Sequence, residues 1–441
     1  MKKSVVLMIA ALGLMVSIFA VFALNRWYPT HGHADWDEVQ QYTADKIPID
    51  HKDFRSDFEE IFEQVKEKYP YTTKKHINLD SIHTTCLQQI DTMQSKVAYS
   101  LLIMEFFANL KCTHANSESI LYPWFIQGDN ITVIENRVFV NHPSVFAIKA
   151  GLQDKDEIVT VDGVPTNKWV MCNSKYVSAS TDATRYLLSA LTILCSYTSP
   201  IKTLGIIRHG RPITITIHLQ SKSVPTKEEE QNVTWRMVSS KVGYINVKSM
   251  QDNADTEFTK ALKHLSKLPY LIVDVRQNGG GNSWIGDNIA QNLIKGKRRN
   301  WNGYTISPST NSYKGKVIIL MGHYSCSSAE TFLITMKESG DAVLVGTSSA
   351  GDTGGIICLF KTSHGIFYRL PVGHSSGTSP KGFPLEGKGI SPNYLVPMKI
   401  NDFLSGKDTQ LDYALQLFTR VRDKKRLEKV GNLVKNSYLY R

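Results

Sequence analysis

A serine between a strand-like run and a helix-like run is the first candidate for chemistry in this sequence. Ser327 lies in the segment His323-Tyr-Ser-Cys-Ser-Ser-Ala-Glu330, directly after an apolar run that ends at Leu320. At such a turn a serine is exposed at the edge of a sheet, and the helix N-terminus behind it offers free N–H groups for developing negative charge. The alternative role is structural, because Ser327 and Glu330 have the S-x-x-E spacing of a capping box.

A glycine-rich turn is the second candidate. The segment Asp274-Val-Arg-Gln-Asn-Gly-Gly-Gly281 follows an apolar strand-like run. Glycines let the backbone turn tightly and come close to a ligand, so their N–H groups could polarise a carbonyl oxygen. A phosphate-binding loop is the rival function, but neither the G-x-x-x-x-G-K-[ST] pattern nor the G-x-G-x-x-G pattern is present. An ordinary turn between strand and helix is the other alternative.

A histidine and a glutamate complete the candidates. His114 ends the segment Leu110-Lys-Cys-Thr-His114, at the end of an amphipathic helical pattern. Glu386 precedes a turn-forming segment that runs to Asn393. Imidazole titrates in the range that general base catalysis needs. By themselves, the default interpretations are a solvated or core histidine for His114 and an exposed loop carboxylate for Glu386.

The ends of the chain bear on location and partners. Of the 441 residues, Lys2 and Lys3 precede an uncharged, apolar run at residues 4–24, which is typical of an export signal. The run is close to the ~20 residues that span a bilayer, so either a cleaved signal or an uncleaved anchor fits. The body of the protein is therefore expected outside the cytoplasm. The net charge of +11 is mostly spread along the chain, and its densest run, at residues 420–426, is interpreted as a solvated helix face, with contact to a membrane surface as the alternative.

The six cysteines form no C-x-x-C pair, which argues against a structural zinc site. An oxidising compartment would permit disulfides, but the spacings dictate no pairing. Cys112 and Cys326 each lie within two residues of a candidate catalytic group, so we expect them to be near each other.

The hydrophobic periodicity divides the chain into regions. Helical spacing dominates residues 53–111, with a break at Tyr69-Pro70. Short β-rich runs follow at 131–134, 137–140, 157–161 and 213–217, with a tight-turn signal at Asp162-Gly163. A polar linker is expected at 221–232. Beyond it, strands at 242–247, 270–275, 317–320 and 342–345 alternate with helices, and this βαβ pattern predicts a largely parallel sheet.

Together, these motifs resemble those of a known family. The order runs from Leu110-x-x-Thr-His114 through Gly151-Leu-x-x-x-Asp-Glu-Ile-x-x-Val-Asp-Gly163, Val242-Gly-Tyr-Ile245 and Leu271-Ile-Val-Asp-Val-Arg-x-Asn-Gly-Gly280 to Ser325-Cys-Ser-Ser-Ala-Glu330, Val345-Gly346 and Gly389-Ile-Ser-Pro-Asn393. It resembles the tail-specific (C-terminal processing) serine peptidases over residues 53–400, and most closely the branch of the tricorn protease core and the interphotoreceptor retinoid-binding protein repeat.

The resemblance implies a Ser–His–Glu site. Ser327 would be the nucleophile, His114 the general base, and Glu386 the group that orients His114, directly or through Thr113. The N–H groups of Gly279 or Gly280, with that of Ser328, would form the oxyanion hole. Relatives with a Ser–Lys dyad carry their lysine where this chain has residues 348–354 without one, and many relatives have Asp where this chain has Cys112. No metal or organic cofactor is expected.

The resemblance also implies the domains and the function. The fold expected is mixed α/β and multi-domain, with a signal or anchor at 1–24, a helical cap at 35–125, a PDZ-like peptide-binding domain at 126–222, a ClpP/crotonase-like core at 233–400 and a helical tail at 401–441. The predicted function is hydrolysis of peptide bonds in extracytoplasmic polypeptides, without a nucleic-acid partner, and the oligomeric state is left open. The alternative is a catalytically silent binder or scaffold for apolar ligands or peptide tails.

Overall fold

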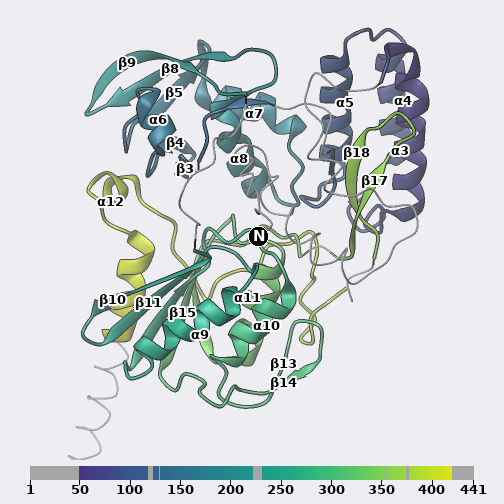
Figure 1. Ribbon diagram of the computed structural model, residues 1–441. Coiled ribbons are helices and arrows are strands. Elements are labelled where there is room, and N and C mark those ends of the chain that lie inside the picture. Colours follow the sequence, from purple (N-terminus) through teal and green to yellow (C-terminus); the bar gives the residue numbers. More distant parts are fainter. Residues whose placement is uncertain are drawn as a thin grey trace, which may run out of the picture.

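The computed structural model describes residues 49–117, 123–128, 130–221, 231–353, 355–373 and 377–419. They form a helical cap, a β-rich domain and an α/β core (Figure 1). The expected signal or anchor at 1–24, the basic run at 420–426 and residues 222–230 of the expected linker lie outside the described residues. Within the ranges that are described, we find no helix with the length and apolar character needed to cross a bilayer.

The core is built on one six-stranded sheet. Its strands, in spatial order, are β10 (Val233–Ser239), β11 (Val242–Val247), β12 (Tyr270–Asp274), β15 (Lys316–Met321), β16 (Ala342–Gly346) and β19 (Tyr394–Leu395). β10 pairs antiparallel with β11, and every other neighbouring pair is parallel. The predicted βαβ core is therefore confirmed.

Side chains that alternate along the core strands cover both faces of this sheet. Leu271 and Val273 of β12 pack on one side, under α9 (Ala254–Leu265), α10 (Ser283–Gln291) and α11 (Ser328–Ser339). Ile272 packs on the other side, where residues 409–419 form a helix that contributes Phe418. Because successive side chains of a strand point to opposite faces, a sheet buried on both faces requires continuous apolar runs such as Leu271-Ile-Val273. Because β12, β15 and β16 are parallel, the loops that follow them meet at one edge of the sheet.

The helical cap consists of α3 (Phe54–Lys68), α4 (Leu79–Ile90) and α5 (Lys96–Asn109), preceded by the short helix η3 (His51–Asp53). The end of α3 at Lys68 confirms the predicted break at Tyr69-Pro70. A hairpin from the core sequence, β17 (Ile357–Lys361) and β18 (Phe367–Pro371), pairs with β1 (Asn116–Ser117) and shares the apolar core of the cap. The hairpin therefore packs with the cap rather than with the predicted 233–400 domain, because its apolar side chains cover the helices.

The β-rich domain has a sheet ordered β3-β4-β5-β8-β9, with β6 paired to β5. The strands are β3 (Ile131–Ile134), β4 (Arg137–Val140), β5 (Glu157–Val161), β6 (Val164–Pro165), β8 (Ile201–Arg208) and β9 (Arg211–His218), and the helices are α6 (Val145–Lys149), α7 (Thr166–Asn173) and α8 (Asp182–Leu191). The predicted strands are all present. Asp162 and Gly163 both have positive φ, as the predicted tight turn requires.

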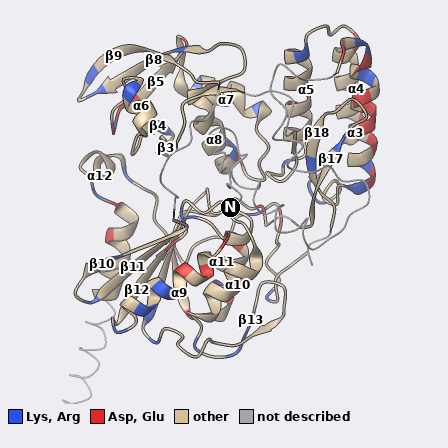
Figure 2. Ribbon diagram, in the orientation of Figure 1, with Lys and Arg blue, Asp and Glu red and all other residues tan. Residues whose placement is uncertain are grey.

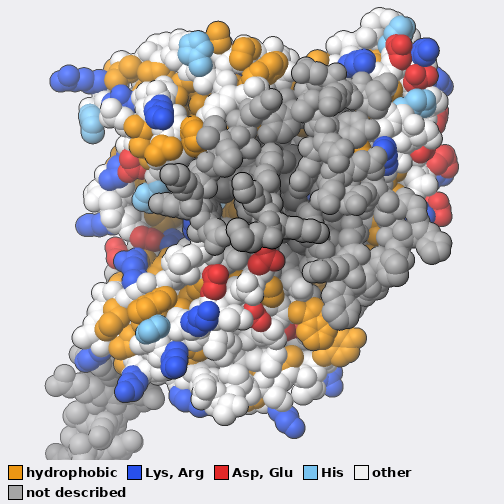
Figure 3. Space-filling model, viewed as in Figure 1, with side chains coloured by type: hydrophobic (Ala, Val, Ile, Leu, Met, Phe, Trp, Pro, Cys, Tyr) orange, Lys and Arg blue, Asp and Glu red, His pale blue; other side chains and the backbone are white. Residues whose placement is uncertain are grey.

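Short elements complete the described chain: β2 (Trp124–Phe125), β7 (Cys195–Ser196), β13 (Arg298–Arg299), β14 (Thr305–Ile306), α12 (Ile400–Leu404), η4 (Ser174–Tyr176) and η5 (Thr192–Leu194). All six cysteines are free thiols, and only Cys172 is exposed. Lysine and arginine residues are distributed over all three parts (Figure 2), and the face seen in Figure 3 shows apolar side chains in scattered groups.

Candidate active site

Ser327 stands at the start of α11 in a strained backbone conformation. Its φ of 55° and ψ of −122° are unusual for a residue with a side chain. The conformation turns the chain sharply from the loop after β15 into the helix, as in a nucleophile elbow. The side chain makes no capping hydrogen bond, and the Ser327 N–H donates to the Asp352 carbonyl oxygen at 3.0 Å. Strain at a residue that caps nothing points to a chemical role for its hydroxyl.

Glu330 does not act as the second half of a capping box. Its buried carboxylate accepts a hydrogen bond from the Ser349 hydroxyl at 2.6 Å, from the Gly351 N–H at 2.8 Å and from the Asp352 N–H at 2.7 Å. Burial raises the pKa of Glu330 to about 7 against these hydrogen bonds. The capping alternative is therefore excluded, and Glu330 instead fixes the loop that follows β16.

The segment that carries His114 is held by side chains from three directions. It follows α5, and Lys111 has a positive φ of 53°. The Tyr69 hydroxyl donates to the Leu110 carbonyl oxygen at 2.6 Å. The Ser178 hydroxyl donates to the Cys112 carbonyl oxygen at 2.6 Å. On the remaining side, the buried Arg369 of β18 donates to the Thr113 carbonyl oxygen at 3.3 Å. The cap, the β-rich domain and the hairpin thus fix His114 jointly.

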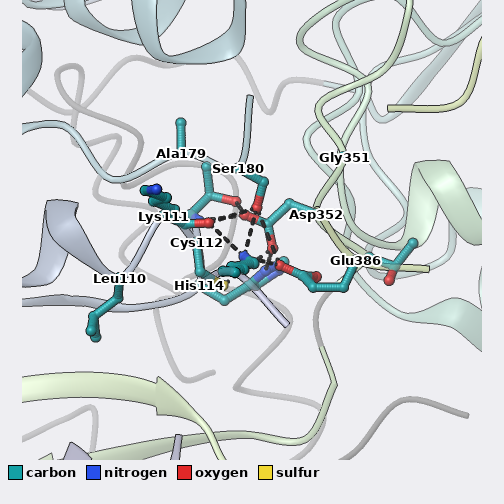
Figure 4. Close-up of polar contacts among 12 residues, drawn as sticks. Leu110, Lys111, Cys112, His114, Ala179, Ser180, Gly351, Asp352 and Glu386 are labelled. Carbon is teal, nitrogen blue, oxygen red and sulfur yellow. Dashed lines mark hydrogen bonds and ion pairs between the residues drawn. The ribbon is translucent and has the colours of Figure 1, made fainter. Parts of the chain in front are cut away.

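Asp352 joins the serine and histidine segments, and Figure 4 shows it beside His114. Its backbone carbonyl binds the Ser327 N–H, and its Oδ1 lies 2.8 Å from His114 Nδ1. Its Oδ2 accepts hydrogen bonds from the Thr113 N–H and hydroxyl. Burial favours the neutral acid, but attraction to and hydrogen bonding with His114, with further contributions from Lys75 and Thr113, hold the pKa of Asp352 well below its usual range. Asp352 is therefore an ionised acceptor.

The protonation of His114 follows from this partner. A carboxylate can only accept, so His114 Nδ1 carries the proton and donates it to Asp352. When the ring is neutral, Nε2 then presents a lone pair. In the described structure this buried Nε2 has no hydrogen-bond partner. The ring is therefore in the tautomer that can take a proton from a serine hydroxyl.

Glu386 lies beside this site with different partners, which corrects the prediction that it orients His114. Its backbone forms a bridge with that of Asp352, but its Oε1 binds the Lys75 ammonium group and the Ser180 hydroxyl. Burial raises the pKa of Glu386 to about 8, the Asp352 charge adds to this, and Lys75 opposes it. Thr113, predicted to connect Glu386 to His114, donates its hydroxyl to Asp352 instead.

The glycine-rich turn lies directly against the serine. A Cβ added to Gly280, whose φ is +107°, would lie 2.6 Å from the Ser327 Cβ. Only glycine fits such an approach. The Gly280 N–H donates to Asn278 Oδ1 at 2.9 Å and is therefore engaged. Within the described chain the N–H groups of Gly279 and Ser328 have no acceptor.

Asp352 and Lys75 were missed by the sequence prediction. The segment 348–354 was used only to argue against a Ser–Lys dyad, because it lacks a lysine. An acidic residue in the loop after a parallel strand could have indicated a site residue, since ligands bind at that edge of a sheet. Lys75 carries no pattern that sets it apart from other lysines. Cys112 and Cys326 do lie close together, since their Sγ atoms contact Oδ1 and the carbonyl oxygen of Asp352, at 3.3 and 3.6 Å.

Three segments match models of known families. Residues 241–396 match peptidase family S41, residues 133–219 match the N-terminal domain of the Bacteroidetes S41 peptidases, and residues 50–108 match the tricorn protease C1 domain. The fold and these matches define an α/β serine-peptidase scaffold. Over residues 241–396 the chain carries a peptidase family S41 domain, and it is similar to the tricorn and carboxyl-terminal processing proteases, which confirms the resemblance.

Individual relatives agree with this placement. The tricorn protease of Thermoplasma acidophilum is 33% identical over 178 residues, which is 40% of this chain and 16% of that protein. The carboxyl-terminal-processing protease of Picosynechococcus is 26% identical over 293 residues, or 63% of this chain and 65% of that protein. Mature CPAF complexed with lactacystin has the same fold, with a TM-score of 0.68 and 15% identity over 84% of this chain and 98% of that one. The chain spans less than two thirds of the length of either curated relative.

Proposed function

We propose that this chain is a serine endopeptidase that hydrolyses peptide bonds in extracytoplasmic polypeptides. The observation that supports it most strongly is the double role of Asp352. Its carbonyl binds the Ser327 N–H, and its carboxylate binds His114 Nδ1. A single residue thereby fixes the position of the proposed nucleophile segment relative to the proposed base.

In the proposed reaction, Ser327 Oγ attacks the scissile carbonyl carbon while His114 Nε2 takes the hydroxyl proton. Asp352 stabilises the imidazolium that forms, without taking its proton. The N–H groups of Gly279 and Ser328 bind the oxyanion, where one such donor is typically worth about 3 kcal/mol of barrier. His114 then passes the proton to the leaving amine. Water next attacks the acyl-enzyme while His114 takes its proton, and His114 finally returns that proton to Ser327 Oγ. In this proposal Glu386 takes no part in the proton transfers, and it forms an ion pair with Lys75.

The β-rich domain is the proposed binding site for extended peptide. Among the strands of the described residues β3 pairs only with β4, which makes it an edge strand there, and α8 lies next to it. A free edge beside a helix allows a peptide to add as a further strand, as in a PDZ-like domain. The extracytoplasmic location rests on the apolar run at 4–24, which lies outside the described residues.

The test is active-site labelling combined with proteolysis. A fluorophosphonate probe should label the wild-type protein, and labelling and cleavage of an unfolded polypeptide should both disappear in Ser327→Ala. Ser339→Ala is the matched control, since Ser339 lies at the other end of α11 and bonds only to the Met336 carbonyl and the Asp341 N–H. Labelling that survives in Ser327→Ala, or a folded wild type that is neither labelled nor active, would refute the peptidase proposal in favour of a silent binder.

A further inference from the structure

Three potential metal ligands of different kinds converge on the proposed general base. Suitable donor atoms of Cys112, His114 and Asp352 all lie within 4.8 Å of one another. The Asp352 Oδ1 lies 2.8 Å from His114 Nδ1 and 3.3 Å from Cys112 Sγ. All three side chains are fully buried. The cysteines suggested no zinc site from their spacing, because two of these three ligands come from one loop and the third from a distant one.

These distances are close to those of a zinc site. Bonds of about 2.0 Å to nitrogen or oxygen and about 2.3 Å to sulfur place tetrahedral ligand atoms roughly 3.3–3.6 Å apart. Asp352 Oδ1 would therefore have to move only about half an ångström from His114 Nδ1 and less from Cys112 Sγ, while the Cys112 and His114 donor atoms, which lie within 4.8 Å of each other, would settle at about 3.5 Å. The set of nitrogen, sulfur and oxygen donors suits Zn²⁺ and is unsuited to Mg²⁺ or Ca²⁺, which take oxygen ligands.

Charge favours the same ion. A bound cysteine is a thiolate, so one thiolate and one carboxylate would together balance the two charges of Zn²⁺. A filled site would thus be electrically neutral, which matters because an uncompensated buried charge is costly. The atoms balance as well: the Cys112 thiol proton leaves to solvent, the His114 proton moves from Nδ1 to Nε2, and water can take the fourth position on the ion.

We propose that Cys112, His114 and Asp352 form an inhibitory Zn²⁺ site that switches off the active site. The proposal rests on the proposed function, because inhibition requires His114 to be the base. An ion on Nδ1 takes the lone pair of that atom and leaves the ring proton on Nε2. His114 would then present a donor to Ser327 where catalysis needs an acceptor. Because the ligands are buried, inhibition should develop slowly after the ion is added.

The inhibition arm uses proteolysis of an unfolded polypeptide by the full chain, with each variant compared with its own rate in the presence of EDTA. Zn²⁺ should inhibit the wild type, and EDTA should restore activity. In Cys112→Ser the inhibitory concentration should rise by at least about 100-fold, since even loss of an outer-shell partner costs 10–100-fold in metal affinity. Cys172→Ser is the matched control, because Cys172 is the exposed thiol that would capture zinc non-specifically. Equal inhibition of wild type and Cys112→Ser, or relief in Cys172→Ser, would overturn the proposal.

The binding arm does not need activity. Co²⁺ added to the Ser327→Ala protein should give the near-ultraviolet charge-transfer band of a cobalt–thiolate bond, and Ser327→Ala/Cys112→Ser should lack it. If the band is present but the wild type cleaves nothing, the peptidase proposal fails while the metal site stands. If the wild type cleaves substrate but the band is absent, or persists without Cys112, the metal site fails alone.

Discussion

Replacing Asp352 by asparagine tests whether the carboxylate of Asp352 or that of Glu386 orients His114. Asparagine keeps the shape of the side chain but exchanges one acceptor oxygen for an NH₂ group. In the wild type, one carboxylate oxygen accepts from His114 Nδ1 and the other from the Thr113 N–H. The Thr113 N–H can only donate, so the amide oxygen of Asn must face Thr113 and its NH₂ must face His114.

This orientation determines the size of the effect. An NH₂ group beside Nδ1 forces that atom to accept and places the ring proton on Nε2. His114 then cannot take the Ser327 proton. The same exchange in a Ser–His–Asp protease of known mechanism lowers kcat about 10⁴-fold, which corresponds to about 5.5 kcal/mol of barrier. We therefore expect Asp352→Asn to lower kcat by about 10³ to 10⁴-fold near neutral pH, with the protein still folded.

The assay is kcat on an unfolded polypeptide, accompanied by the rate of fluorophosphonate labelling of Ser327 and by thermal unfolding. Glu386→Gln is the matched comparison, because Glu386 contacts Lys75 and Ser180 rather than His114. Its effect on kcat should be much smaller. If Asp352→Asn retains a kcat within roughly tenfold of the wild type while Glu386→Gln shows the large loss, the assignment of Asp352 is refuted and the original Ser–His–Glu prediction is restored.

Three further predictions concern the surroundings of the site. In urea titrations above pH 8, where Glu386 is ionised, Lys75→Met should lower the unfolding free energy by about 3 kcal/mol, since it leaves a buried carboxylate unpaired, and adding Glu386→Gln should recover part of it. The pKa of Glu386 is raised from 4.5 to about 8, so the folded state binds this proton more tightly than the unfolded state does. The unfolding free energy should therefore fall as pH rises from about 4.5 to 8. In Glu386→Gln the urea midpoint should fall less across the same range. Gly280→Ala should lower kcat at least about 100-fold by displacing the oxyanion donors, whereas Gly210→Ala, with open space around its Cβ, should leave kcat unchanged.

The sequence alone determined the elements and the ends of the helices that carry the site. The apolar runs of the core strands and the apolar spacing of α11 predicted strand, turn and helix around Ser327, and the structure ends that helix at Gly340 in the left-handed conformation. The helix that ends before His114 was predicted in the same way. Such features depend on neighbours within a few residues, so the local pattern is sufficient to find them.

Only the tertiary structure decided which side chains meet. Glu330 has the spacing of a cap, yet its carboxylate holds the loop at 349–352, because buried N–H groups there need an acceptor. Asp352 and Glu386 are neighbours through a backbone bridge, and only Asp352 reaches His114, which lies 238 positions earlier in the chain. Which of two adjacent carboxylates reaches the imidazole depends on how the cap, the β-rich domain and the core pack together, and no local pattern records that packing.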